Sequence, residues 1–286
     1  MTIAAQDTFW HRLTSLRVGL GRVRLLTAST QEELATLPDD APCPIILGNG
    51  TNLIGSDDDG ATALRLAVPN GARPELTRDG TLRLPAALPL TIALRQCADM
   101  GWGGLAALAG IPGTVGGAVA MNAGALGVEI ASAVTALDGW NLTQRRPWHW
   151  TDGDDGFAYR HSPVPPNVIL LSCDLRLKPV APTVERAAIE AELLRRRQTN
   201  PQGASAGSVF RNPDGDLPSA GKLLDECGCK GLAAGNLQIS PLHANWIMNP
   251  TGEPATAADA RELVDRARAR VQNRYNITLQ TEWRWA

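Results

Sequence analysis

The stretch that decides the fold is GWGGLAALAGIPGTVGGAVAMNAGALGV, residues 101–128, which contains no charged side chain. A run of this length is long enough for a membrane-spanning helix, which needs about 20 apolar residues. Nine of its residues are glycine, however, and each glycine weakens a helix by roughly 1 kcal/mol relative to alanine. Large aliphatic side chains, on which membrane insertion depends, are scarce here. The stretch therefore predicts backbone that approaches a ligand closely, not a membrane anchor.

The bulk composition narrows the class of protein. The chain has 286 residues, a formal net charge of -2 and a pI of about 6.1, and no basic block suggests nucleic acid as a partner. The N-terminal sequence lacks the pattern of a secretory signal, and five cysteines, an odd number, fit reduced thiols. We therefore expect a cytoplasmic protein. Cys227 and Cys229 lack further ligands at metal-site spacing except His243, so free thiols are favoured.

Local patterns predict a mixture of strands and helices. Strands are expected at 45–47, 81–84, 131–141, 168–179 and 277–285, and helices are expected after Thr30, around 90–100, from Thr183 to Arg197 and from Thr256 to about Tyr275. The last of these helices carries an apolar stripe at helical spacing, formed by Ala260, Leu263, Val264, Ala267 and Val271. Prolines 179 and 182 precede the 183–197 helix and mark a domain boundary there.

Several short motifs allow either a functional or a purely structural interpretation. The loop Gly48–Asn52 follows a strand and can form an anion-binding nest or a plain turn. Ser208 can act as a nucleophile, donate a proton or cap a turn, and Arg160 can clamp a carboxylate or lie exposed. Glu282, between bulky apolar residues, can act as an acid or pair with Arg284 at an edge strand.

The order of the motifs along the chain is more informative than any one of them. The motifs are LGNGTNL, LAGIPGTVGGAVAMNAGALGVEI, FAYRHSPV, SAGSVFRNP, AGKLLDECGCKG, HANWIMNPTGEPATAADARELVDRARARV and LQTEWRW. In this order the chain closely resembles the UDP-N-acetylenolpyruvoylglucosamine reductase (MurB) family of peptidoglycan synthesis. The likeness covers nearly the whole chain. The short third segment, with Lys222, resembles the type II branch, which lacks an extra substrate-covering loop.

The resemblance implies an α+β flavoprotein with three domains. Residues 1–70 and 71–182 would form a two-domain FAD-binding unit of the PCMH (vanillyl-alcohol-oxidase-like) type. Residues 183–286 would form an α+β substrate-binding domain whose last strand carries Glu282 back to the active site.

The resemblance also implies noncovalently bound FAD, with NADPH as hydride donor and no metal. The residues expected at the FAD pyrophosphate are Gly48, Asn49, Gly50, Thr51 and Asn52. Those expected around the rest of the cofactor are Gly113, Thr114, Gly116, Gly117, Asn122 and Gly124. Backbone donors flanked by small side chains suit a ligand that carries two phosphates.

The family's reaction converts UDP-N-acetylglucosamine enolpyruvate to UDP-N-acetylmuramate. By resemblance, Arg160 stabilises the negative charge that develops toward the substrate carboxylate, Ser208 donates a proton, and Glu282, in its protonated form, polarises the carboxylate. The other expected substrate contacts are Tyr159, Asn212, Lys230, His243 and Arg284, with one of Arg195, Arg196 and Arg197 near the diphosphate. The resemblance implies no protein partner, nucleic acid or membrane insertion.

Some positions depart from the family pattern. His161 stands where the family has aspartate, Pro85-Ala86-Ala87 replaces Gly-Ala-Gly, and Thr51 replaces a common serine. Two rival functions are a flavin oxidase on the same scaffold and a non-catalytic flavin-binding paralogue. The GSVFRNP motif, Arg160 and Glu282 disfavour both rivals.

Overall fold

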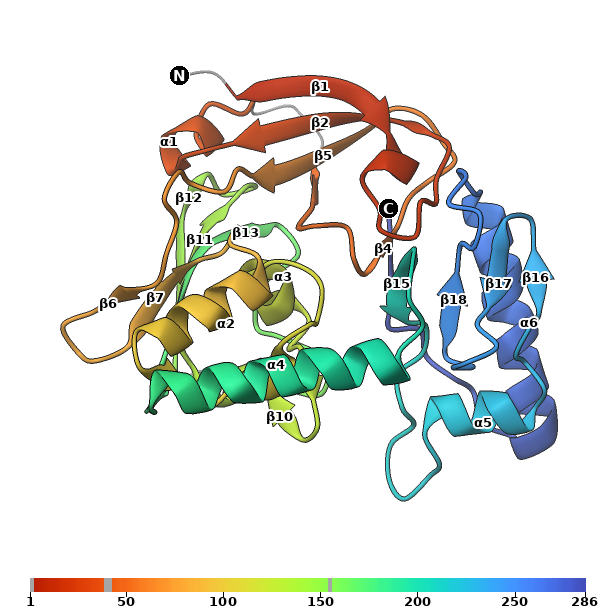
Figure 1. Ribbon diagram of the computed structural model, residues 1–286. Coiled ribbons are helices and arrows are strands. Elements are labelled where there is room, and N and C mark those ends of the chain that lie inside the picture. Colours follow the sequence, from red (N-terminus) through yellow and green to blue (C-terminus); the bar gives the residue numbers. More distant parts are fainter. Residues whose placement is uncertain (1–2, 39–42, 154–155) are drawn as a thin grey trace. The chain divides into compact units, whose positions relative to one another are not determined.

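The computed structural model describes residues 3–38, 43–153 and 156–286 (Figure 1). Helices and strands are interspersed along the chain, which confirms the expected α+β class.

The chain divides into two compact units. The first unit contains residues 1–6, 25–48 and 62–198, and the second contains residues 7–24, 49–61 and 199–286. The domain boundaries expected near residues 70 and 182 stay predictions.

The first unit is built on a five-stranded sheet in the order β12-β11-β13-β7-β6, with antiparallel neighbours. These strands are β6 (Glu75–Leu76), β7 (Leu82–Pro85), β11 (Val134–Asn141), β12 (Arg146–Thr151) and β13 (Val168–Leu175). Three of the expected strands, at 81–84, 131–141 and 168–179, therefore lie side by side in this sheet. The second of them starts later than expected, because Ile130–Ser132 forms the 3-10 helix η3.

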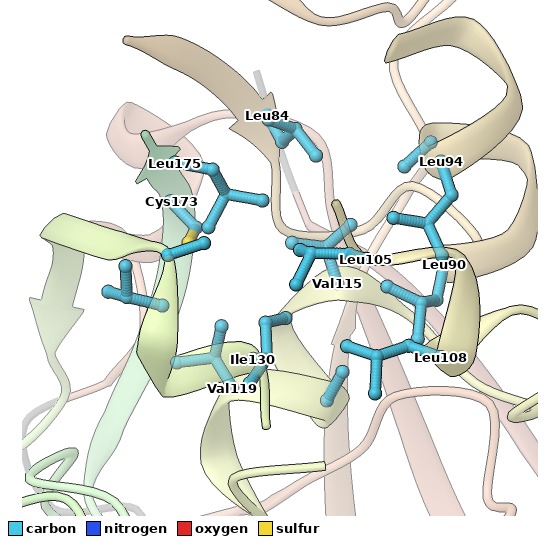
Figure 2. Close-up of a cluster of buried hydrophobic side chains, with 14 of the residues drawn as sticks. Leu84, Leu90, Leu94, Leu105, Leu108, Val115, Val119, Ile130, Cys173 and Leu175 are labelled. Carbon is cyan, nitrogen blue, oxygen red and sulfur yellow. The ribbon is translucent and has the colours of Figure 1, made fainter. Parts of the chain in front are cut away.

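Two helices cover this sheet and share its apolar core. They are α2 (Leu90–Asp99) and α3 (Val115–Ala120), and α3 contacts β7 and β13. Figure 2 shows the side chains that meet in this layer, among them Leu84, Leu90, Val115, Val119 and Leu175, each at most 1% exposed. Each such burial contributes roughly 1.5–3 kcal/mol, so this layer fixes the position of α3.

The charge-free stretch 101–128 folds as a series of short elements around α3. They are β8 (Trp102–Gly103), η2 (Ala106–Leu108), β9 (Gly124–Ala125) and the first residue of β10 (Val128–Glu129). Within the described ranges, no helix combines the length and the apolar composition that crossing a bilayer requires.

A second, four-stranded sheet has the order β1-β2-β5-β3. Its strands are β1 (Ala4–Phe9), β2 (Arg22–Ala28), β3 (Ile45–Ile46) and β5 (Ala61–Leu66), and β3 pairs parallel with β5. The helix expected after Thr30 is α1 (Gln31–Leu34), and the Thr30 side chain caps it by accepting the amide of Glu33. The helix expected from Thr183 is α4 (Pro182–Thr199). It follows the short strand β14 (Lys178–Pro179), which pairs with β8.

In the second unit, one helix packs on a four-stranded sheet and a second helix contacts the first (Figure 1). The sheet has the order β15-β18-β17-β16, formed by β15 (Ser205–Ser208), β16 (Ala233–Ala234), β17 (Leu237–Ile239) and β18 (Trp246–Met248). The helices are α5 (Ala220–Glu226) and α6 (Ala257–Tyr275). The whole apolar stripe expected on α6 is buried, and Thr256 caps the helix. The prediction for this helix is confirmed.

The N-terminus of α6 has a second cap that comes from far along the chain. The Asp57 carboxylate accepts the amides of Ala257 at 2.9 Å and Ala258 at 3.2 Å. Asp57 to Asp59 are exposed, but Asp57 also accepts the amide of Leu20. Asp57 is therefore a structural anchor for α6.

The expected C-terminal strand at 277–285 was wrong for most of its length. Only Arg284–Trp285 is a strand, β19, and it pairs parallel with β4 (Leu53–Ile54). Of the preceding residues, Thr281 makes an isolated antiparallel bridge to Phe210. Glu282 thus precedes the strand in which it was expected.

Candidate functional site

The loop Gly48–Asn52 links β3 to β4 and depends on a glycine at its centre. Gly50 has a φ of +63°, and a Cβ there would lie 1.9 Å from the carbonyl oxygen of Leu13. The Gly50 carbonyl accepts hydrogen bonds from the Ser15 amide at 2.9 Å and the Ser15 hydroxyl at 3.2 Å. The same hydroxyl donates to the Ser205 carbonyl at 2.6 Å. Close backbone packing therefore fixes the shape of this loop.

The first three amides of this loop point to an anion site. Among the described residues, none accepts a hydrogen bond from the amides of Gly48, Asn49 or Gly50. Successive unused N–H groups in a glycine loop are typical of phosphate-binding nests. The side chain of Asn52, by contrast, donates to the Glu282 carbonyl at 3.1 Å.

The start of α3 lies against the first residue of this loop. The Thr114 hydroxyl accepts the Gly117 amide at 3.1 Å and so caps the helix. A Cβ on Gly48 would lie 3.0 Å from that hydroxyl, and a Cβ on Gly117 would lie 3.3 Å from it. Gly113, just before, has a φ of +130°. Three of the expected cofactor residues, Gly48, Thr114 and Gly117, are thus brought together.

Gly116 is a helical glycine whose φ is not positive. Its amide donates to the Ala86 carbonyl at 2.8 Å, and a Cβ would lie 3.1 Å from the Ala86 Cβ. Ala86 belongs to the Pro85-Ala86-Ala87 departure and is buried. Close packing, not backbone conformation, is what requires glycine at this position.

We expect Gly116→Val to lose FAD and to lower the melting temperature, because the added methyl groups would push α3 away from Ala86. Overpacking of this kind typically costs about 1–3 kcal/mol. Gly116→Ala adds only the Cβ and should give a smaller loss. The dissociation constant for FAD and the thermal unfolding midpoint measure both effects. FAD binding by Gly116→Val as tight as that of the parent protein would contradict the assignment.

Arg160 is held over the residues that follow α3. Its guanidinium donates to the carbonyls of Asn122 at 3.4 Å and Gly124 at 3.2 Å, and it lies 5.0 Å from the centre of the Tyr159 ring. The turn that presents it is closed by two backbone hydrogen bonds between Ala158 and His161. The exposed His161 side chain leaves these bonds intact, so replacement of the family's aspartate does not open the turn.

In the second unit, the backbone segments that carry Ser208 and Glu282 come from distant parts of the sequence and are hydrogen-bonded to each other. Ser208 ends β15, opposite Trp246 of β18. The Glu282 amide donates to the Val209 carbonyl at 2.8 Å, one residue after Ser208. The Trp283 indole donates to the Ala206 carbonyl at 3.0 Å and ties the same two segments.

A residue that the sequence interpretation missed holds the backbone after Ser208. The buried side chain of Asn245 accepts the Phe210 amide at 2.9 Å and donates to the Phe210 carbonyl at 2.8 Å. The Asn245 carbonyl accepts the Val209 amide at 3.0 Å. Its only sequence signal is an amide side chain at the start of the apolar segment NWIM, which by itself does not indicate a partner.

An open cavity of about 560 Å³ lies beside α5. It is lined by Ser219, Gly221, Lys222, Asp225, Glu226, Lys230, Leu242, His243 and Ala244. Its size falls within the usual range for ligand pockets. The Asn212 side chain accepts a hydrogen bond from the amide of Ala220 at 3.0 Å. Ala220 directly precedes Gly221, which lines the cavity.

The charges in this cavity are largely paired. Lys230 lies 2.7 Å from Asp225, and Lys222 lies 3.9 Å from Glu226. His243 Nδ1 accepts the Asn245 amide at 3.2 Å, so its Nε2 carries the hydrogen when the ring is neutral. Burial is the main cause that lowers the pKa of His243, which favours this neutral form.

The arginines expected to contact the substrate also make interactions within the protein. Arg284 lies in β19, exposed, and its amide donates to the Asn52 carbonyl at 3.0 Å. Arg195 and Arg196 each lie 2.7 Å from the Glu192 carboxylate on α4. A hydrogen bond from Arg195 is the main cause that lowers the pKa of Glu192, so this carboxylate is ionised at neutral pH.

Comparisons with known proteins point to one reductase family for nearly the whole chain. The family model for the C-terminal domain of UDP-N-acetylenolpyruvoylglucosamine reductase matches residues 198–286, and a model for an FAD binding domain matches residues 25–143. The reductase of Chloroflexus aurantiacus is 38% identical over 88% of this chain and 86% of its own length. The reductase of Acidiphilium cryptum is 39% identical over 88% and 79%, respectively.

The fold comparison gives the same result. The crystal structure of the Thermus caldophilus reductase (MurB) has a TM-score of 0.83 and 33% sequence identity, and the likeness covers 99% of both chains.

Proposed function

Because this chain belongs to the UDP-N-acetylenolpyruvoylglucosamine reductase family, we propose that it reduces UDP-N-acetylglucosamine enolpyruvate to UDP-N-acetylmuramate with NADPH, in peptidoglycan precursor synthesis. FAD, when bound, would supply the two-electron redox chemistry that links NADPH to the enolpyruvyl group. The protein's own residues must bind the cofactor, hold the substrate carboxylate and deliver one proton.

The glycine-rich segments fit FAD. The unused amides of Gly48, Asn49 and Gly50 offer donors for the pyrophosphate, and the Thr114 region presents small residues that let backbone approach a flat ring system. Thr51, which keeps the hydroxyl of the common serine, and Asn52 complete this loop. We assign Gly113, Gly116, Gly117 and Gly124 to the remaining cofactor surface. Asn122 supports this surface indirectly, because its side chain makes hydrogen bonds to Glu129, Ala158 and Ala131.

Three side chains are assigned to the chemistry. Hydride addition to the vinyl carbon builds negative charge toward the substrate carboxylate, and the guanidinium of Arg160 stabilises that charge. The Ser208 hydroxyl gives its proton to the carbon that bears the ether oxygen, which completes the lactyl ether. Glu282, protonated, donates a hydrogen bond to the carboxylate and draws charge away from the reacting carbon.

The observation that carries the proposal is the hydrogen bond between the Glu282 amide and the Val209 carbonyl. It supports a shared role for Ser208 and Glu282, because the backbone segments that carry them lie far apart in the sequence and yet are hydrogen-bonded to each other in the fold. Asn245 fixes the Val209 and Phe210 backbone, so the position of Ser208 is defined before any substrate binds.

The cavity beside α5 is assigned to the nucleotide part of the substrate. Lys222 and Lys230 bring positive charge to its wall, and neutral His243 offers an Nε2 hydrogen to a carbonyl or phosphate oxygen. Asn212, Tyr159 and Arg284 are assigned as further substrate contacts. The free thiols of all five cysteines support a cytoplasmic location.

Two measurements test the function. The purified protein should be yellow, and its flavin absorbance should be released by denaturation, since no covalent bond holds the cofactor. NADPH oxidation should require UDP-N-acetylglucosamine enolpyruvate, with one NADPH consumed for each UDP-N-acetylmuramate formed. UDP-N-acetylglucosamine, which lacks the enolpyruvyl group, is the control substrate.

Other results would reject the proposal. NADPH oxidation that depends on oxygen and ignores the enolpyruvyl sugar would favour the oxidase. A colourless protein that cannot be reconstituted with FAD would remove the basis of the assignment.

A further inference from the structure

The buried side chain of Asn122 joins three segments near Arg160. Its amide nitrogen donates to the Glu129 carboxylate at 2.8 Å and to the Ala158 carbonyl at 2.9 Å. Its carbonyl oxygen accepts the Ala131 amide at 3.2 Å. Both amide hydrogens and the oxygen are thus used, and the side chain is 0% exposed. This residue links the end of α3, the β9–β10 hairpin and the turn that carries Arg160.

The side chains of Glu129 and Arg160 both lie close to one glycine. A Cβ on Gly124 would lie 2.9 Å from the Glu129 Cγ and 3.3 Å from the Arg160 Nη1. The Gly124 carbonyl accepts from the Arg160 Nη2 at 3.2 Å. The absence of a side chain at Gly124 lets the acidic and basic side chains approach the same strand.

The backbone around these groups is held in an uncommon conformation. Six non-glycine residues in the described part of the chain have a positive φ, and three of them are Asn122 at +41°, Leu126 at +52° and Arg160 at +56°. Leu126 lies at the tip of the β9–β10 hairpin. Left-handed backbone at such residues persists only where surrounding contacts enforce it. The Asn122 hydrogen bonds supply such contacts.

We propose that Glu129 is a positioning residue for Arg160. Its carboxylate fixes the Asn122 amide, and Asn122 fixes the Ala158 carbonyl at the start of the turn whose backbone presents Arg160. A hydrogen bond to a carboxylate is stronger than one between neutral groups, which suits a link that has to hold a strained turn. The part that Arg160 plays in the reaction rests on the proposed function, whereas the link from Glu129 to the turn does not.

The first test uses the protein without substrate. Glu129→Ala leaves an Asn122 N–H without its acceptor, so hydrogen exchange at the amides of Ala131 and His161 should become about tenfold faster. Glu129→Gln keeps an acceptor oxygen and should stay near the parent rate. Glu75→Ala makes the same change at an exposed strand position and is the matched control. Parent-like exchange in Glu129→Ala, or an equal change in Glu75→Ala, would refute the link.

The second test measures the two half-reactions. Glu129→Ala should slow the reaction with the enolpyruvyl sugar about tenfold and leave the reaction with NADPH within twofold of the parent. In an Arg160→Lys background the same change should add less than twofold, because the residue through which it acts is already altered. Equal slowing of both half-reactions, or full additivity with Arg160→Lys, would overturn the proposal.

The two tests separate this proposal from the function itself. A parent protein that does not react with the enolpyruvyl sugar would refute the proposed function, and the exchange experiment would still decide whether Glu129 positions the turn.

Discussion

Ser208→Ala is expected to slow the reaction with the enolpyruvyl sugar by at least ~10²–10⁴-fold, the usual loss when a general acid is removed. The reaction with NADPH needs no proton from Ser208 and should continue at nearly the parent rate. Stopped-flow absorbance of the flavin follows each half-reaction separately. Ser208→Cys should recover part of the activity, because a thiol also donates a proton.

The control for this variant lies in the same strand. Ser205→Ala keeps the backbone carbonyl that accepts from Ser15 and removes only a side-chain hydroxyl, so both half-reactions should stay near the parent rates. Equal slowing of both half-reactions by Ser208→Ala would show that Ser208 shapes the site and does not supply the proton. Unchanged rates would return it to the role of a turn serine.

Gly50→Ala is expected to abolish tight FAD binding and to lower the melting temperature. The new Cβ would lie 1.9 Å from the Leu13 carbonyl oxygen, a distance at which the backbone has to move. The φ of +63° adds a conformational cost of about 1–2 kcal/mol for a non-glycine residue. Movement of this loop would also displace the amides of Gly48 and Asn49. Titration of the apoprotein with FAD and thermal unfolding measure the two effects.

Gly71→Ala separates the steric effect from the conformational one. Gly71 has a similar φ of +71°, but no atom lies within 4 Å of the position of its missing Cβ. This control should be destabilised only by the conformational cost of a positive φ, and it should bind FAD like the parent protein. Equal losses in both variants would show that backbone conformation, not contact with Leu13, makes Gly50 necessary.

The sequence by itself determined the elements whose signals are local. The α6 helix followed from the Thr256 cap and the apolar stripe, because both repeat at the spacing of one helix. Three strands of the main sheet, β7, β11 and β13, followed from apolar runs bounded by turns, whereas β6 and β12 were not predicted. The motif order led to the flavoprotein family, and the comparisons confirm it. The glycine content of 101–128 was enough to reject a spanning helix, since glycine weakens helices wherever it occurs.

Tertiary structure decided what depends on pairs of residues far apart in the chain. Asp57 caps α6, Asn245 holds Phe210, Asn122 joins Glu129 to the Arg160 turn, and none of these contacts repeats with a period that a sequence window can reveal. The C-terminal strand was overestimated for a related reason: a β-strand needs consecutive residues paired with a partner strand. Arg284–Trp285 pairs in this way with β4, whereas Thr281 makes one isolated bridge, to Phe210. Local propensity determines which segments can form a helix or a strand. The hydrogen-bond partners that folding brings together determine which of those segments do form one.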